Sequence, residues 1–539
     1  MKMRSILIPV VMFWAAAAWG ADATPAPAEA TAASPPASAP GGAFTLKETR
    51  LGPNEMGDIP PVLSRDQRHF AYVATRDVKF CVIRDGQAEA EYDAIVRDAL
   101  VFSPDGKRLA YPVQKGEKHL VVVDGQAGAE FGGLLDGSVI FSSDGKRVAY
   151  AALKGTDWSV IVDGQAGLAY DAVLPGSLIF SADGQHLAYA AQKGEKWVAV
   201  FDGQAGAECD AIGNPVLSPD GKRTAYPFEK GGKWSVLVDG QASPEYDEIM
   251  AGSLSFSSDG KRVVYGARKG EKWLAVVDGQ AGAEYDRIGK PHFSPDGQRV
   301  AYKFQKEAKW SAMVDGQAGP EFDQILDPGI LGPDGMRIFE GLLIFSPDSK
   351  RVAYGAQKEG KQMVVVDGRA GPEYDSLVEA VPIVFSPDSK RVGYAAQKGQ
   401  KQMAVIDGQA NAEYDGISFV HFSPDSKRVA YVAQTEGISS VVVDGQVGAK
   451  YQANMGLIPI FSPDSAHVAY QVDHDQKCVA VLDATEVKKY DAILTGTLSA
   501  NPAIHLGTLN FGPDGSLEWL ALIDDAIYRA QCLPTVPGR

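Results

Sequence analysis

The chain has 539 residues, of which 45% are hydrophobic, and it carries a formal net charge of −16 at pH 7. The length exceeds that of one ordinary domain of roughly 100–200 residues, and the composition is typical of a globular protein. A surface this acidic repels phosphate backbones, so we expect no nucleic acid as a partner.

Residues 1–21 are expected to be a cleaved secretory signal. Lys2 and Arg4 precede an apolar run from Ile6 to Ala18, and small residues follow up to Ala23. A signal peptide has this order, and the run is shorter than the roughly 20 apolar residues of a spanning helix. The sequence therefore predicts an exported protein, periplasmic or secreted, without a transmembrane segment in the mature chain.

Residues 22–42 form a compositionally biased segment, DATPAPAEATAASPPASAPGG. Ala, Pro, Ser, Thr and Gly bury little apolar surface, so this composition predicts a disordered or extended linker.

The rest of the chain consists of twelve copies of one repeated sequence unit. Each repeat begins with a stretch like Phe-Ser-Pro-Asp-Gly, and the first residue of that stretch is taken as position 0. Nine of the eleven intervals between these origins are 37–40 residues, and the other two are 52 and 50. Position 22 is Asp in each of the first eleven repeats, and position 29 is Tyr or Phe in ten of them, Cys209 being the exception. The twelve origins are Leu63, Phe102, Phe141, Phe180, Leu217, Phe256, Phe293, Phe345, Phe385, Phe422, Phe461 and Phe511.

Each repeat predicts four short strands. An apolar stretch such as SLIF leads into the Ser-Pro-Asp-Gly turn, and KRVAYAA, WSVIV and AEYDAI supply the next three strands. A lone four-stranded sheet leaves its apolar faces open, whereas stacked sheets bury Tyr and Trp against their neighbours. Four-stranded units near 40 residues are typical of β-propeller blades. The sequence therefore predicts an all-β propeller of twelve four-stranded blades of about 39 residues.

The stretch FSPDGKRLAY…VVVDGQ resembles the WD40-like, PD40-type repeat in the propeller of TolB-like periplasmic proteins. The resemblance covers residues 44–533. The chain lacks the Gly-His and Trp-Asp dipeptides of true WD40 repeats, and it lacks the additional α/β domain of TolB proteins. The resemblance implies a propeller fold, and these departures give no support to a role in the Tol system.

Twelve repeats favour two rings, because propellers usually have four to eight blades. An insertion at 327–341 follows the seventh repeat, after which FSPDG becomes FSPDS and Trp gives way to KQM. We therefore expect a first propeller over 43–326 (repeats 1–7) and a second over 342–539 (repeats 8–12). An even division into six and six stays open.

The last repeat ends after its third predicted strand. At the other end of the repeat region, residues 43–50 read AFTLKETR and form an unassigned strand-like stretch. We expect this stretch to supply the missing fourth strand of the last blade.

One rim of the propeller should carry a row of lysines, because the loop between the second and third strands lies on one rim. The insertions 327–341 and 494–508 are expected on the same rim. Such a rim is a candidate docking surface for an acidic partner, and ordinary solubilising lysine is the alternative. The lysines at position 13 are Lys115, Lys154, Lys193, Lys230, Lys269, Lys306, Lys358 and Lys398.

His292 and His421 precede their origins on the innermost strand. They are candidates for lining a central channel, and packed, hydrogen-bonded histidines are the alternative. The repeated Asp residues belong to turns that offer one carboxylate each, whereas calcium needs clustered oxygen ligands. We therefore expect no metal and no cofactor.

The chain has four cysteines without metal-type spacing, for which buried free thiols are the preferred interpretation, although an exported protein could oxidise them. They are Cys81, Cys209, Cys478 and Cys532.

No catalytic motif is found: the chain has no Gly-x-Ser-x-Gly elbow, and its carboxylates recur in step with the repeat. We therefore expect no enzyme. The sequence predicts an exported scaffold that binds a protein or an envelope polymer, with the partner and the oligomeric state left open. The alternative is a propeller enzyme, or a small-ligand or polysaccharide binder, that acts at a channel mouth.

Overall fold

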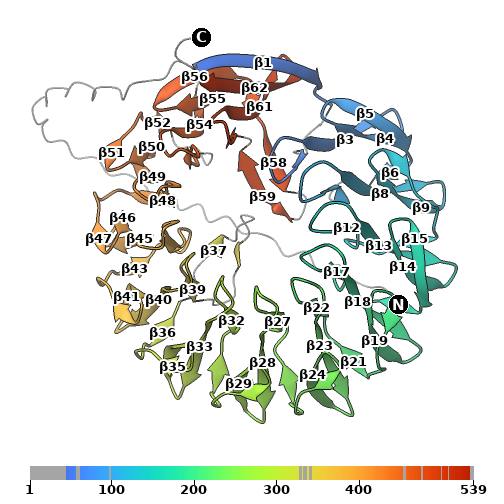
Figure 1. Ribbon diagram of the computed structural model, residues 1–539. Coiled ribbons are helices and arrows are strands. Elements are labelled where there is room, and N and C mark those ends of the chain that lie inside the picture. Colours follow the sequence, from blue (N-terminus) through green and yellow to red (C-terminus); the bar gives the residue numbers. More distant parts are fainter. Residues whose placement is uncertain are drawn as a thin grey trace, which may run out of the picture. The chain divides into compact units, whose positions relative to one another are not determined.

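The computed structural model describes residues 44–55, 61–95, 99–326, 330–331, 337–338, 343–452, 457–474, 477–498, 501–507 and 509–534. From Ala43 onward the chain is one compact unit, which consists of β-strands (Figure 1). None of the described residues belongs to a helix long and apolar enough to cross a bilayer. The secretory signal and the linker predicted for residues 1–42 lie outside the described residues.

Blade 3 shows the plan of every blade. The second strand β13 (Val148–Lys154) pairs antiparallel with the third strand β14 (Asp157–Val162), which pairs with the outer strand β15 (Gln165–Tyr170). The inner position is taken by two short strands, β11 (Gly133–Leu134) and β12 (Ile140–Phe141), which both pair with β13. Each blade therefore has four strand positions, and the innermost one is interrupted.

The same four positions recur around the ring. The second strands are β3 (Phe70–Arg76), β8 (Leu109–Lys115), β13, β18 (Leu187–Lys193), β23 (Thr224–Lys230), β28 (Val263–Lys269), β33 (Val300–Lys306), β40 (Val352–Lys358), β45 (Val392–Lys398), β49 (Val429–Thr435), β54 (Val468–His474) and β61 (Leu517–Ile523). The third strands are β4 (Lys79–Arg84), β9 (Lys118–Val123), β14, β19 (Lys196–Phe201), β24 (Lys233–Val238), β29 (Lys272–Val277), β34 (Lys309–Val314), β41 (Lys361–Val366), β46 (Lys401–Ile406), β50 (Ile438–Val443), β55 (Lys477–Leu482) and β62 (Ala526–Pro534). The outer strands are β5 (Gln87–Tyr92), β10 (Gln126–Ala127), β15, β20 (Gln204–Ala205), β25 (Gln241–Ala242), β30 (Gln280–Ala281), β35 (Gln317–Ala318), β42 (Arg369–Ala370), β47 (Gln409–Ala410), β51 (Gln446–Val447) with β52 (Tyr451–Gln452), β56 (Thr485–Tyr490) and β1 (Phe44–Pro53).

The inner position holds the shortest strands. Its first halves are β6 (Ala94–Ile95), β11, β16 (Ala172–Val173), β21 (Ala211–Ile212), β26 (Glu248–Ile249), β31 (Arg287–Ile288), β36 (Gln324–Ile325), β43 (Ser376–Leu377) and β57 (Ala492–Ile493). Its second halves are β2 (Val62–Leu63), β7 (Val101–Phe102), β12, β17 (Ile179–Phe180), β22 (Val216–Leu217), β27 (Ser255–Phe256), β32 (His292–Phe293), β39 (Ile344–Phe345), β44 (Val384–Phe385), β53 (Ile460–Phe461) and β60 (Asn510–Phe511). In blade 10 a single bulged strand, β48 (Gly416–Phe422), covers both halves.

The predicted fourth strand AEYDAI is divided between two blades. Tyr170 pairs with Trp158 inside blade 3, whereas Val173 pairs with Ala191 in blade 4. The chain crosses from one blade to the next at Asp171. The division has a physical reason, since the inner edge of each second strand exposes backbone groups that need hydrogen-bond partners.

The two turns of the repeat fold through their own side chains. Asp163 and Gly164 both have positive φ, 51° and 81°, as the type I′ hairpin turn requires. In the other turn, Ser142 Oγ donates to Asp144 Oδ1 at 2.7 Å and accepts the backbone N–H of Arg147 at 2.9 Å. Because these bonds satisfy its hydroxyl group, Ser142 can be fully buried in the turn.

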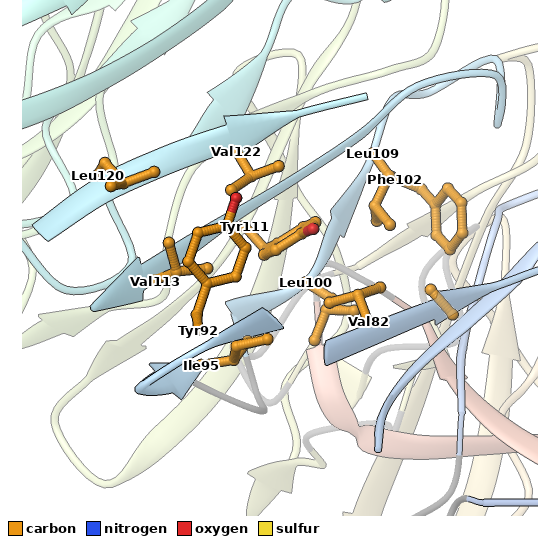
Figure 2. Close-up of a cluster of buried hydrophobic side chains, with 11 residues drawn as sticks. Val82, Tyr92, Ile95, Leu100, Phe102, Leu109, Tyr111, Val113, Leu120 and Val122 are labelled. Carbon is orange, nitrogen blue, oxygen red and sulfur yellow. The ribbon is translucent and has the colours of Figure 1, made fainter. Parts of the chain in front are cut away.

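Aromatic side chains join neighbouring blades. The ring at position 29 of one blade meets the Tyr at position 9 of the next edge to face, as Tyr246 and Tyr265 do with ring centroids 6.4 Å apart. Figure 2 shows the joint between blades 1 and 2, where Tyr92 and Tyr111 lie in one buried cluster with aliphatic residues of both blades. A single blade could not bury these rings, so the repeats are stable only as neighbours.

The chain closes into one ring. Strand β1 pairs antiparallel with β62, with Leu46 opposite Cys532, and so forms the outer strand of blade 12. Blade 12 in turn packs on blade 1, because Leu520 and Ile527 share a buried cluster with Leu63. The twelve blades therefore form a single cycle (Figure 1).

The expected division into two propellers, seven and five blades or six and six, is not confirmed. After repeat 7 the chain passes into blade 8 as at every other joint, because β36 pairs with β40. Across the same joint, Ser349 Oγ accepts the backbone N–H of Asp296 at 2.9 Å, and the Arg299 guanidinium lies over the Phe345 ring. The 327–341 insertion enters between β36 and β39 and leaves the blade-to-blade contacts unchanged.

Candidate functional site

The lysines at position 13 lie at the end of the second strands of eight consecutive blades, 2 to 9. All eight are exposed. Within the described part of the chain, Lys115 has an ion pair, 3.8 Å from Glu130, and the other seven have none within 4.0 Å. We call these eight residues the lysine rim. They are Lys115, Lys154, Lys193, Lys230, Lys269, Lys306, Lys358 and Lys398.

A second row of lysines on the same face has a structural role. Lys309 Nζ donates to Asp323 Oδ1 at 2.6 Å, and Asp323 Oδ2 accepts the backbone N–H of Glu359 in the next blade at 2.7 Å. The Lys309 ammonium is the main cause that lowers the pKa of Asp323. The eight such pairs are Lys79–Asp93, Lys196–Asp210, Lys233–Asp247, Lys272–Asp286, Lys309–Asp323, Lys361–Asp375, Lys401–Asp415 and Lys477–Asp491. These lysines, at position 16, hold the ring together and differ from those of the lysine rim.

The opposite rim carries an arginine that also joins two blades. Arg391 Nε donates to Asp407 Oδ2 in its own blade at 2.9 Å. Its Nη1 donates to the backbone carbonyl of Lys427 in the next blade at 3.0 Å, and the guanidinium lies 5.1 Å from the Phe422 ring centroid. Eight of the first eleven repeats have Arg at this position 6. The repeated Asp at position 22 is thus part of a blade-to-blade contact.

Three repeats have histidine at position 6, a regularity that the sequence analysis missed. The Nδ1 atoms of His69, His186 and His467 lie 2.7, 2.7 and 2.5 Å from Oδ2 of the position-22 Asp. Among the described residues these imidazoles make no hydrogen bond to the next blade as Arg does, although the His467 ring packs edge to face on Phe44 of blade 12 with centroids 5.2 Å apart. Arg84 compensates in blade 1, since its guanidinium reaches the backbone carbonyl of Lys107. Alignment of the histidines on the repeat origins would have revealed this set.

The structure does not bring His292 and His421 together. His292 belongs to β32 in blade 7 and His421 to β48 in blade 10, with two blades between them. The His292 Nε2 atom lies 2.7 Å from the carbonyl oxygen of Leu343. The His421 ring stacks on Phe419 with centroids 6.5 Å apart. Both residues are half-buried, and burial lowers the pKa of both imidazoles.

The 494–508 insertion, expected on the lysine rim, lies elsewhere. Strand β58 (Thr495–Leu498) pairs in parallel with the inner strand β2 of blade 1, and β59 (Asn501–Gly507) pairs with β58. Both strands lie on the inner side of the ring (Figure 1). The expectation was wrong because the length variation enters at the interruption of the inner strand. In the 327–341 insertion the structure describes the hairpin of β37 (Ile330–Leu331) and β38 (Arg337–Ile338).

In the described ranges, potential metal ligands do not cluster, and the cysteines are not paired. No group of three or more His, Cys, Asp or Glu side chains lies close enough there to hold a metal ion. The four cysteines are free thiols, and three of them are buried. Burial raises the pKa of Cys209 and of Cys532 to about 11, so these thiols stay protonated and unreactive at neutral pH.

No family model and no curated protein sequence matches the chain. Among solved structures, TolB from Acinetobacter baumannii is 18% identical with a TM-score of 0.22, over 41% of this chain and 64% of that chain. The β-propeller domain of the Trilobed protease from Pyrococcus furiosus is 15% identical with a TM-score of 0.24, over 50% and 92%. A eukaryotic initiation factor is 13% identical with a TM-score of 0.34, over 72% and 96%. TolB and other β-propellers are thus among the structures similar to this chain, and likenesses at this level carry no argument on function.

Proposed function

We propose that the chain is an exported, non-enzymatic scaffold that binds an acidic protein or envelope polymer through its lysine rim. The observation that supports this proposal is a contrast between three repeated cations. The arginines at position 6 bond directly to the next blade, as Arg391 does, and the paired lysines at position 16 are linked to it through an Asp, as Lys309 is through Asp323. The lysines at position 13 are exposed, and among the described residues none of them forms an ion pair with a neighbouring blade.

The charge of the rim favours an acidic partner over a neutral one. In eight blades the position-16 lysine is paired with an Asp carboxylate, as Lys361 is with Asp375 at 2.6 Å. In blades 2 to 9 the exposed lysine at position 13 adds a cation to this face, and among the described residues seven of these eight lysines have no carboxylate within 4.0 Å. Attraction between a lysine row and an acidic surface mainly raises the association rate and fixes the orientation of the partner. Binding should therefore weaken steeply as the salt concentration rises.

The repeated carboxylates support the non-enzymatic part of the proposal. A catalytic pair of carboxyl groups needs two different environments, whereas Asp323 and its counterparts have the same two partners in blade after blade. These carboxylates are already engaged in holding the ring. Export rests on the order of residues 1–21 alone and is tested by fractionation of cells that express the full chain, with and without those residues.

The lysine rim is tested by neutralising all eight of its lysines to Gln and using the full chain to capture partners from a native envelope extract. The matched control neutralises seven exposed lysines of the opposite rim: Lys107, Lys146, Lys222, Lys261, Lys350, Lys390 and Lys427. We expect the rim variant to lose partners that the native chain and the control variant both retain. If the rim variant captures the same set as the native chain, the lysine rim is not the docking surface.

A further inference from the structure

A cavity of about 820 Å³ lies between blades 2 and 3. Phe102 and Val113 of blade 2 form one wall, and Leu134 and Val139 of blade 3 form the other. His119, from the third strand β9, lies at one end of the cavity. Sites for small molecules usually have about 300–1,000 Å³ and mostly apolar walls, so this cavity has the size and the character of a ligand site.

The cavity exists because repeat 2 departs from its neighbours at position 17. Repeats 3 to 7 have Trp there, and the Trp packs against the buried cluster of the following joint, as Trp158 does beside Val173 and Leu178 of blade 4. The counterparts of Val173 and Leu178 in blade 3 are Leu134 and Val139, which line the cavity. Repeat 2 has His119 at position 17, and imidazole is much smaller than indole. The joint between blades 2 and 3 therefore lacks the indole ring that repeats 3 to 7 supply at this position. Repeats 8 and 9 have Gln there instead, and the Gln362 and Gln402 side chains accept the backbone N–H groups of Leu377 and Ile417. The other Trp residues of this type are Trp197, Trp234, Trp273 and Trp310.

Position 30 is a second place where repeat 2 departs from most other repeats. Gly132 stands where most repeats have the Asp of the Lys–Asp pair, so Lys118 lacks the carboxylate that its counterparts bond. Gly133 follows, and the nearest atom to a Cβ placed on it would be 3.7 Å away in Leu153. Both glycines thus face Leu153 and leave out the Lys–Asp pair that other joints have beside this position.

His119, Gln114 and Asp136 are the polar side chains that line the cavity, and His119 is the one that stands in the place of Trp. Its ring nitrogens make no hydrogen bond to any other residue in the described part of the chain, whereas the neighbouring Gln114 amide donates to the carbonyl of Gly116 at 2.9 Å. The side chain is partly exposed, so water satisfies its nitrogens in the free protein. A bound molecule with an N–H or O–H group would replace that water as hydrogen-bond donor to the unprotonated nitrogen.

The geometry points to a binding site for a planar aromatic molecule about the size of indole, seated between blades 2 and 3 and bonded to His119. The Trp side chains at the other joints of this ring are the argument for this occupant. At four of the five joints between blades 3 and 8, the indole ring of Trp158, Trp234, Trp273 or Trp310 packs against the buried cluster between the two blades. A free aromatic molecule in the cavity would make the contacts that the Trp side chain makes there. The site lies apart from the lysine rim and does not depend on the function proposed for it.

The test is isothermal titration of the full chain with indole. Three chains are compared: the native chain, His119→Trp, and Gln402→Trp, which adds the same side chain at position 17 of repeat 9. We expect indole to bind beside His119 in the native protein and in Gln402→Trp, and an affinity at least about tenfold lower for His119→Trp, because its own indole occupies the place beside Leu134 and Val139. Absence of binding to the native chain at millimolar indole, or equal binding to His119→Trp, would overturn the proposal.

Two further measurements separate loss of the binding site from loss of the fold and test the hydrogen bond to His119. Val139→Phe narrows the cavity from the opposite wall without touching His119, so it should also weaken binding if His119→Trp fails to fold. Titration with 1-methylindole, which cannot donate a hydrogen bond, should give a weaker affinity than indole for the native chain. Equal affinities for the two compounds would remove His119 from the site as a hydrogen-bond acceptor.

Discussion

The guanidinium of Arg299 in blade 7 lies over the ring of Phe345 in blade 8, 5.6 Å from its centroid, although the 327–341 insertion separates the two repeats. Arg299 Nε also donates to Asp315 Oδ2 at 2.7 Å in its own blade, and Nη1 donates to the carbonyl of Lys350 at 2.6 Å. One side chain thus connects two blades through three kinds of contact. The same relationship occurs at joints without an insertion, which is why the insertion does not mark the end of a ring.

Replacement of Arg299 by Ala should lower the free energy of unfolding by about 2 kcal/mol, because hydrogen bonds to charged groups and the cation–π contact are lost together. The measurement is urea denaturation followed by circular dichroism. Lys350→Ala is the control, since the Lys350 side chain is 82% exposed and its nearest ion pair is 3.9 Å long. A loss for Arg299→Ala no larger than for Lys350→Ala would show that the contact does not stabilise the joint.

A single ring predicts that neither half is stable alone. A protease site placed within 327–341 should give a cut chain whose two parts elute together on size exclusion, because blades 7 and 8 still share their core. Residues 43–326 expressed alone should aggregate, since the exposed face of blade 7 would present Phe322 and Trp310 to water. Two separate, folded and monodisperse fragments would instead favour the two-propeller organisation.

Much of a blade follows from the sequence, because its determinants are local. The Asp-Gly pair at 163–164 demands positive φ, and Tyr150 needs a neighbour to bury it; both facts are readable from one repeat. The number of blades in a ring depends instead on the rotation between neighbouring sheets, which many weak contacts such as Tyr246–Tyr265 determine jointly. No single residue of the repeat encodes that rotation.

Of the candidate sites, the lysine rim could be predicted from the sequence and the cavity could not. The lysine rim follows from one count along the repeat, and its exposure agrees with that count. The cavity at His119 does not follow from such a count, because it depends on a residue that repeat 2 lacks, the Trp at position 17. The three histidines of position 6 were within reach of the sequence. The sequence analysis missed them because it compared the histidines with known motifs and not with their position in the repeat.

Closure of the ring depends on the inward face of β1. Leu46 lies against the buried cluster of blades 11 and 12, whereas the neighbouring Lys47 is exposed. Leu46→Asp should therefore lower the free energy of unfolding by about 2 kcal/mol through the cost of a desolvated carboxylate, and Lys47→Asp should change it by less than about 0.5 kcal/mol. Thermal unfolding measures both variants. Equal effects would mean that β1 is not an integral strand of blade 12.

Repeats 8 to 11 have Ser at position 4, where repeats 2 to 7 have Gly, and a pair of substitutions tests the reason for the exchange. Ser389 has φ 65°, a conformation that favours Gly, and its Oγ accepts the backbone N–H of Asp348 in the preceding blade at 2.9 Å. Ser389→Ala loses the bond and keeps the strain, whereas Ser389→Gly loses the bond and relieves about 1 kcal/mol of strain. Chemical denaturation should thus find the Ala variant less stable than the Gly variant. The reverse order would contradict this account of the serine.

Acid should weaken the ring within a defined range of pH. The Ser257 hydroxyl is the main cause that lowers the pKa of Asp259 to about 2, and Ser423 does the same for Asp425. A carboxyl whose pKa is lower in the folded state stabilises the fold above its ordinary pKa of 3.8 and loses that contribution as the pH falls toward 2. The thermal midpoint should therefore be nearly constant from pH 7 to 5 and should fall between pH 4 and 2. Ser257→Ala is the matched variant, because without the hydroxyl the pKa of Asp259 rises and the fall with pH becomes shallower. A midpoint that stays constant down to pH 2 would show that these turn carboxylates do not contribute to stability. The Ser–Asp pairs, each with a buried hydroxyl and an exposed carboxylate, would then serve only to shape the turn.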